Sequence, residues 1–195
     1  YLADCVIKTS DTFIVNQNMF SKVYFPRLIV PFSIVTTNLI KFAIQFALFL
    51  LVLAYYILFD DEAQVATWGF SIHLLWLPYL IVLMGLLGLG TGLIISALTT
   101  KYRDLRFLIQ FGVQLAMYAT PVVWPLKGID AEHHWKVFLN PMTSIIETFK
   151  VAFFGKDFAV LSFEAIAYSS LFSIVVLIIG VRLFSRVEKS FMDTI

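Results

Sequence analysis

Charged residues and cysteine are scarce in this sequence. Only 14% of its 195 residues are charged, whereas soluble globular domains carry about 25%. Hydrophobic residues make up 60%, and the mean hydropathy is +0.88. These values exclude a soluble globular domain. The single cysteine, Cys5, excludes an internal disulfide, and a net charge of +1 gives no reason to expect a nucleic-acid partner.

The sequence shows no carboxylate, histidine or nucleotide-binding loop at a position where catalysis or proton-coupled transport would require one. No carboxylate or histidine lies deep within a long apolar run, so no proton relay is visible. No G-x-x-x-x-G-K-S/T loop is present, so the chain itself is not expected to bind ATP. His133 and His134, beside Glu132, lack a third convergent ligand and are interpreted as a solvated loop. We therefore expect no catalytic residue, no metal site and no cofactor bound by this chain.

What the sequence does contain is a set of long apolar segments, at 42–59, 74–98, 107–123 and 166–183. A helix needs about 20 mostly apolar residues to cross a bilayer. Apart from closed barrels, only helices satisfy their backbone hydrogen bonds in lipid. The sequence thus predicts an all-α, polytopic membrane helical bundle with about four transmembrane helices, in a single transmembrane domain over residues 1–195.

The distribution of lysine and arginine predicts the orientation of these helices. Lys101, Arg103 and Arg106 fill a short loop between two apolar segments, and basic loops resist translocation. With that loop inside, ten of the 14 Lys and Arg residues fall on the cytoplasmic side and four on the other. Both ends of the chain are then cytoplasmic, and segment 127–163 lies outside.

Within the outer segment, residues 137–155 are predicted to form a periplasmic re-entrant region. Glu147 and Lys150 argue against a full span, because charged side chains are costly in hydrocarbon. Pro141 suits the first turn of a helix. A short helix over Met142–Phe154, ended by Gly155, is therefore expected.

Two further patterns suggest packing or docking surfaces. Gly88, Gly92 and Ser96 recur every four residues and give the second span a face that another backbone can approach closely. This face serves either packing within the chain or a subunit–subunit or pore-wall surface. Segment 10–27 is predicted to be cytoplasmic and partly helical, broken by Pro26. Such an amphipathic segment lies on the bilayer surface or docks into a partner protein.

Two loops hold candidate ligand-contacting residues. Arg103 and Arg106 offer planar forks suited to phosphate oxygens, and Tyr102 offers a ring for stacking. The alternative is that this basic loop only sets the topology. Trp124 follows Pro121 at the end of the third span, where an indole typically anchors a helix at the membrane interface.

Five motifs in a fixed order carry a family resemblance. They are KVYFPR at 22–27, TTKYRDLR at 99–106, ATPVVWP at 119–125, NPM at 140–142 and VEKSFMD at 187–193. Together they resemble the type-2 ABC permeases that export polysaccharide, over essentially the whole chain. Within that family the sequence is most similar to permeases for O-antigen (lipopolysaccharide) export, with capsule and teichoic-acid exporters as near relatives.

The resemblance implies a multi-pass protein of the bacterial inner membrane that forms a homodimer with a second copy of itself. It implies two cytoplasmic ABC ATPase subunits that hold ATP and Mg, and a lipid-linked polysaccharide as substrate. It also implies that an N-terminal part, with an interface helix and two further spans, precedes this sequence. The implied ATPase-coupling residues are Phe20, Lys22, Tyr24, Phe25, Pro26 and Arg27. Candidates for the substrate path are Tyr102, Arg103, Arg106 and Trp124.

The leading hypothesis is a non-catalytic membrane subunit of an ATP-driven exporter of O-antigen-type polysaccharide. A type-2 ABC permease for a drug or small lipid is the alternative within the same transport class. An integral membrane sugar or acyl transferase is a competing class, and the lack of suitably placed carboxylates and histidines argues against it.

Overall fold

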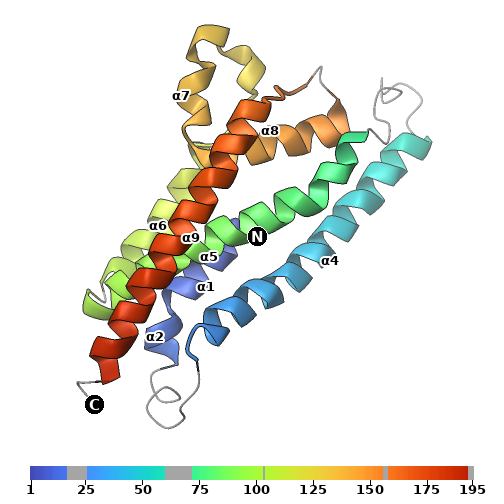
Figure 1. The fold of residues 1–195 in the computed structure, drawn as a ribbon. Coiled ribbons are helices and arrows are strands. Elements are labelled where there is room, and N and C mark those ends of the chain that lie inside the picture. Colours follow the sequence, from blue (N-terminus) through green and yellow to red (C-terminus); the bar gives the residue numbers. More distant parts are fainter. Residues whose placement is uncertain (17–25, 60–71, 103, 156–157, 193–195) are drawn as a thin grey trace. The chain divides into compact units, whose positions relative to one another are not determined.

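A computed structural model describes residues 1–16, 26–59, 72–102, 104–155 and 158–192 (Figure 1). The elements in chain order are α1 (Leu2–Ser10), α2 (Thr12–Val15), α4 (Ile29–Phe59), η2 (Ile72–Trp76), α5 (Leu77–Lys101), α6 (Leu105–Tyr118), η3 (Leu126–Gly128), η4 (Ala131–His133), α7 (His134–Phe138), α8 (Pro141–Phe154) and α9 (Phe163–Met192). No strand occurs among the described residues. The predicted all-α class is confirmed.

Three helices in the described part of the chain are long and apolar enough to cross a membrane. They are Ile29–Phe59, His73–Lys101 and Phe163–Glu188, with 31, 29 and 26 residues. These ranges contain the spans predicted at 42–59, 74–98 and 166–183. The first of them begins at Ile29, before residue 42 where the predicted span starts.

The span predicted at 107–123 is shorter in the structure. Helix α6 covers Leu105–Tyr118, 14 residues, which corresponds to about 21 Å at 1.5 Å per residue. A hydrocarbon core is about 30 Å thick. Pro121 gives the physical reason, because its ring would clash with the carbonyl of Met117 and it has no N–H for the helix. Three helices rather than about four therefore meet the length requirement among the described residues.

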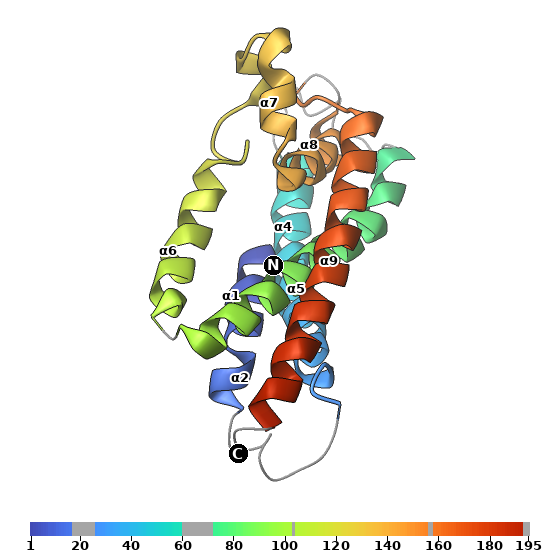
Figure 2. The ribbon, with the colours of Figure 1, turned by 60° about the vertical axis from the view of Figure 1, so that its left-hand side comes forward.

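The described residues group into two compact units. The first unit comprises Tyr1–Leu39, Met84–Ala116 and Phe172–Ile195. In it α1 and α2 lie beside α5 and α9 (Figure 2). Its core contains Phe13 of α2, Leu93 of α5 and Phe184 of α9. The rings of Phe13 and Phe184 stack with their centroids 4.5 Å apart, so α2 is fixed to α9 by aromatic packing.

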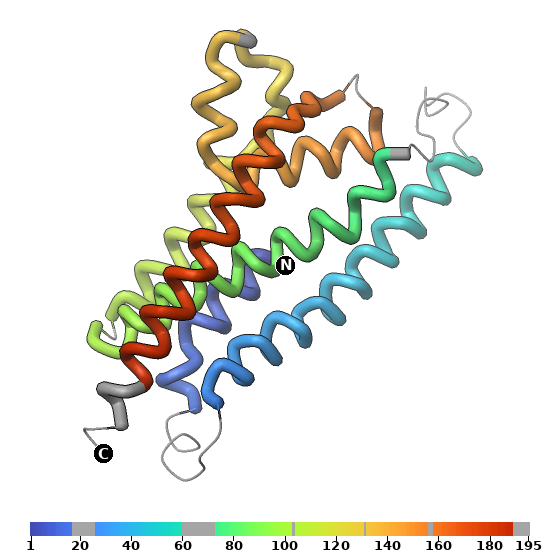
Figure 3. The backbone as a smooth tube through the Cα atoms, viewed as in Figure 1, coloured from blue at the N-terminus to red at the C-terminus, as the bar shows by residue number. Residues whose placement is uncertain are grey.

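The second unit comprises Ile40–Leu83 and Met117–Leu171 and contains the short helix α8. The chain turns sharply between α7 and α8 (Figure 3). At this turn the Asn140 side chain accepts a hydrogen bond from the N–H of Met142 at 3.0 Å, and Pro141 occupies the first helical turn. Gly155, with φ of 82°, ends the helix in a conformation that favours glycine. The predicted helix over Met142–Phe154 is confirmed.

Apolar packing holds α8 within the second unit. Phe153 and Ala152 of α8 and Leu77 of α5 are buried together. Aromatic rings from α4 surround them: the ring centroid of Phe49 lies 5.2 Å from that of Phe153, and the centroid of Phe46 lies 5.9 Å from it. Burial of these apolar side chains stabilises α8 in the second unit, although the helix also carries the charged residues Glu147 and Lys150.

Candidate functional site

Several helix ends meet in the first unit, and they include the basic regions predicted to be cytoplasmic. Arg106, at the start of α6, forms an ion pair of 2.8 Å with Asp11, between α1 and α2. Arg27, just before α4, lies 3.9 Å from the carboxylate of Glu188 near the end of α9. Within this unit, one ion pair thus ties the start of α6 to the junction of α1 and α2, and the other ties the start of α4 to the end of α9.

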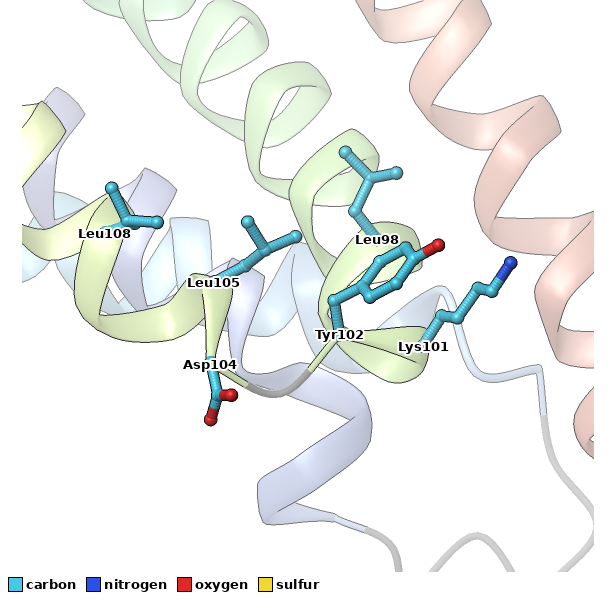
Figure 4. A pocket seen from close by; sticks show the side chains of 6 residues that line it. All are labelled: Leu98, Lys101, Tyr102, Asp104, Leu105 and Leu108. Atoms are coloured by element: carbon cyan, nitrogen blue, oxygen red, sulfur yellow. The ribbon is translucent and has the colours of Figure 1, made fainter.

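A hollow of about 690 Å³ opens at the loop between α5 and α6. It is lined by Leu98, Lys101, Tyr102, Asp104, Leu105 and Leu108 (Figure 4). The ammonium of Lys101 lies 5.2 Å from the centroid of the Tyr102 ring. Figure 4 shows these two side chains side by side, with Asp104 pointing away from them. An apolar wall next to a cation and an exposed ring suits a ligand that combines a hydrocarbon chain with an anionic head group.

Arg106 does not line this hollow but holds Asp11. The carboxylate of Asp11 is largely buried, and its Oδ1 has no hydrogen-bond partner among the described residues. Burial raises the pKa of Asp11, and the charge and hydrogen bond of Arg106 lower it in part. Arg106 thus compensates a buried charge. The position of Arg103 lies outside the described residues.

Replacing Arg106 with Gln is expected to destabilise the protein by about 1–3 kcal/mol, because a buried acceptor loses its charged partner. The loss should grow as the pH rises. Without Arg106 the pKa of folded Asp11 is raised further, and only the ionised carboxylate needs the arginine. Melting curves of the full-length protein in detergent at two pH values test this. The double variant D11N/R106Q should recover most of the loss; no recovery would show that Arg106 acts elsewhere.

The predicted coupling segment is described only in part. Phe20, Lys22, Tyr24 and Phe25 lie outside the described residues. Pro26 is exposed directly before α4. Arg27 is buried, and besides its ion pair it donates a hydrogen bond of 3.4 Å to the backbone carbonyl of Glu188. Within this segment Arg27 therefore faces inward, toward α9.

The face of small residues on α5 is occupied by α1. A Cβ added at Gly88 would lie 2.8 Å from the Cβ of Cys5, and one added at Gly92 would lie 2.6 Å from the Cβ of Thr9. Ser96 is fully buried on the same face. Of the two interpretations left open by the sequence, the structure thus shows packing within the chain.

Trp124 and the adjacent histidines have local roles in the second unit. The indole N–H of Trp124 donates to the carbonyl of Tyr118 at 3.2 Å and so satisfies one of the free carbonyls at the end of α6. The Nε2 of His134 lies 3.0 Å from the carbonyl of Ile129. Among the described residues, no three His, Cys, Asp or Glu side chains gather as potential metal ligands.

Two features of the structure were not predicted from the sequence. One is the buried carboxylate of Glu147, which accepts hydrogen bonds from the Val160 N–H at 2.9 Å and from Lys150 at 3.0 Å. Lys150 also donates to the carbonyl of Pro121. The sequence signal for this ion pair is the spacing of three residues between Glu147 and Lys150 on one helix. The other feature is the close approach of α5 and α9, which no spacing within one helix reveals.

Comparison with known proteins agrees with this arrangement of apolar helices and short polar connections. The model of the family described as "ABC-2 type transporter" matches residues 4–154. The chain belongs to the ABC-2 type transporter family. Family membership, the three apolar helices and the bacterial relatives together support a multi-pass protein of the bacterial inner membrane.

Curated relatives of this ABC-2 chain carry one name, "O-antigen export system permease protein RfbA". Two such proteins from Klebsiella pneumoniae are 23% and 24% identical over 182 and 183 residues, which is 93% of this chain and 66% of each relative. One from Myxococcus xanthus is 29% identical over 141 residues, 71% of this chain and 50% of the relative. The chain therefore spans slightly less than two thirds of the length of the first relatives.

Proposed function

We propose that this chain is part of the membrane-spanning subunit of an ATP-driven exporter of lipid-linked polysaccharide of the O-antigen type. The observation that carries this proposal is the shared name of the curated relatives over most of the chain, together with family membership. In this proposal the subunit is not an enzyme. ATP and Mg are bound by a separate cytoplasmic ABC ATPase, and two copies of the subunit enclose the path of the glycan.

Coupling to the ATPase is assigned to the segment from Phe20 to Arg27. The inward-facing Arg27 supports this assignment, because its contacts with Glu188 join the end of that segment to the end of α9. A push on the segment would then reach α9 through the contacts of Arg27 with Glu188. The segment would deliver motion to the helix without any nucleotide chemistry of its own.

Entry of the substrate is assigned to the hollow at the loop between α5 and α6. The leucines of its wall would accept part of the lipid, while Lys101 would face the phosphate groups. Arg103 stays a candidate from the sequence alone. Tyr102, with 53% of its surface exposed, offers a ring for the first sugar. Arg106 has a supporting role in this proposal, since it pairs with Asp11.

Deleting the gene for the full-length protein is expected to remove the long-chain polysaccharide from the cell surface, because no other subunit would form its path. Lipid-linked glycan should accumulate at the inner face of the membrane. Surface labelling and extraction of lipid-linked glycan measure both effects, and the wild-type gene supplied in trans is the control. Normal surface polysaccharide together with a lost drug resistance would assign the chain to a different ABC-2 substrate.

A further inference from the structure

The second unit contains a hollow that the proposed path of the substrate does not use. It has a volume of about 440 Å³ and lies between α7, with the residue after it, and the start of α9. His134, Trp135 and Phe138 line it from α7, and Ser162, Glu164 and Tyr168 line it from the α9 side. By the orientation that the basic residues predict, this hollow lies on the outer side of the membrane.

Hydrogen bonds fix the frame of this hollow. The hydroxyl of Tyr168 donates to the carbonyl of Leu139 at 3.3 Å and joins the start of α9 to the end of α7. Because a carbonyl only accepts, the 3.0 Å contact of His134 Nε2 with Ile129 places the proton on Nε2. In the neutral imidazole, Nδ1 is then an acceptor.

Two side chains of the hollow, Glu164 and Trp135, offer polar groups to a ligand. Glu164 is exposed and has no ion-pair or hydrogen-bond partner among the described residues. The indole of Trp135 is 61% exposed, and its N–H has no acceptor in the described part of the chain. Lys136 lies over the Trp135 ring at 5.8 Å but does not line the hollow. An anchor in lipid headgroups would not need the carboxylate.

The combination of these groups selects a class of ligand. Sugar rings present C–H faces that pack on aromatic rings, and hydroxyls that both donate and accept hydrogen bonds. Trp135 and Tyr168 supply rings, Glu164 accepts, and the indole N–H donates. The carboxylate disfavours a phosphate. A quaternary ammonium needs rings arranged around one point and has no acceptor for the indole N–H, whereas a sugar hydroxyl accepts from it.

We propose that the hollow between α7 and the start of α9 binds a neutral sugar residue of the exported glycan after it has crossed the membrane. This inference rests on the proposed function. Holding a sugar at the outer side would oppose backward sliding of the chain between ATPase cycles. The binding should be weak, with a Kd on the order of 1 mM, so that export is not stalled.

Saturation-transfer NMR on the full-length protein in nanodiscs tests the proposal, with oligosaccharides cut from the organism's own surface polysaccharide as probes. Wild-type protein should show saturable binding. Trp135→Ala and Glu164→Ala should each weaken it about tenfold or more, because each removes one contact type. Both side chains are exposed, so folding should be preserved. Trp76→Phe, at a tryptophan outside the hollow that packs against Tyr79 and Phe163, is the matched control.

Equal binding by wild type and both variants would overturn the proposal, and so would choline binding in place of the oligosaccharide. The result is separable from the proposed function. If gene deletion leaves the surface polysaccharide intact, the exporter assignment fails, whatever the NMR shows. If deletion abolishes export while the Trp135 and Glu164 variants bind the oligosaccharide normally, only the site proposed here fails.

Discussion

Replacing Gly90 with Leu is expected to prevent the full-length protein from accumulating in a folded form. Gly90 lies where α5 meets α9 in the first unit, and a Cβ at this position would be 2.7 Å from the backbone nitrogen of Leu177 and 2.8 Å from its Cα. From the other side, a Cβ at Gly180 would be 2.5 Å from the carbonyl oxygen of Gly90. Two backbones in direct contact leave no side chain that can move aside.

The cost of the substitution follows from this geometry. Overpacking a well-packed core costs about 1–3 kcal/mol where side chains can shift, and more where they cannot. Here α5 and α9 must separate, so we expect about 3 kcal/mol or more. Small residues that let backbones approach closely are a main source of helix association in membranes. The contact at Gly90 therefore contributes to the assembly of the first unit and not only to local packing.

Fluorescence-detected size-exclusion chromatography after heating measures this effect. Gly112 is the matched control, since a Cβ there meets nothing within 4 Å on the exposed helix α6. Gly112→Leu should therefore be tolerated. Gly85→Ala should fall between the two, because its neighbour at 3.0 Å is the tip of the Tyr1 side chain. If Gly90→Leu and Gly112→Leu behave alike, α5 and α9 do not meet at Gly90.

Replacing Glu147 with Leu is expected to destabilise the second unit by about 3–5 kcal/mol, the usual cost of removing one partner from a buried ion pair. Glu147 is 1% exposed, and its carboxylate joins Lys150 to the backbone N–H of Val160. Lys150 in turn holds the carbonyl of Pro121. Loss of the carboxylate therefore leaves the Val160 N–H without its acceptor and leaves the ammonium of Lys150 with the Pro121 carbonyl alone.

Thermal stability in detergent again gives the measurement, with a series of variants that separates charge from shape. Glu147→Gln keeps an acceptor for Val160 and should lose less than Glu147→Leu. The double variant E147L/K150M replaces the pair with apolar groups and should recover part of the loss. Glu132, an exposed carboxylate in the same unit, is the control, and Glu132→Leu should be neutral. A loss as large at Glu132 as at Glu147 would contradict the role of the pair.

Much of the fold could be predicted because its signals lie within single segments. The start of α8 is signalled by Asn140 and Pro141 and its end by Gly155, so both ends can be predicted from the sequence. The long apolar runs likewise predict three of the apolar helices. The span predicted at 107–123 is longer than α6 because Pro121, whose missing N–H ends the helix, lies within that uncharged run.

The site was harder to predict because its contacts join distant positions. The four-residue spacing of Gly88 and Gly92 is visible in one helix, whereas the contact of Gly90 with Gly180 depends on which helices meet. In the same way, Arg106 had the chemistry of a phosphate ligand, but its partner Asp11 lies far away in the sequence. Residue types indicated what these side chains could bind. Tertiary packing determined what they do bind.

The central claim is that the full-length protein forms the path for a lipid-linked polysaccharide driven by an ABC ATPase. Inverted inner-membrane vesicles that contain both proteins test it most directly, with added glycosidase as the probe of sidedness. The account predicts that ATP makes the lipid-linked glycan resistant to the enzyme, because the glycan moves into the vesicle lumen. Glycan that stays equally accessible with and without ATP, or becomes protected in vesicles lacking this protein, would contradict the account.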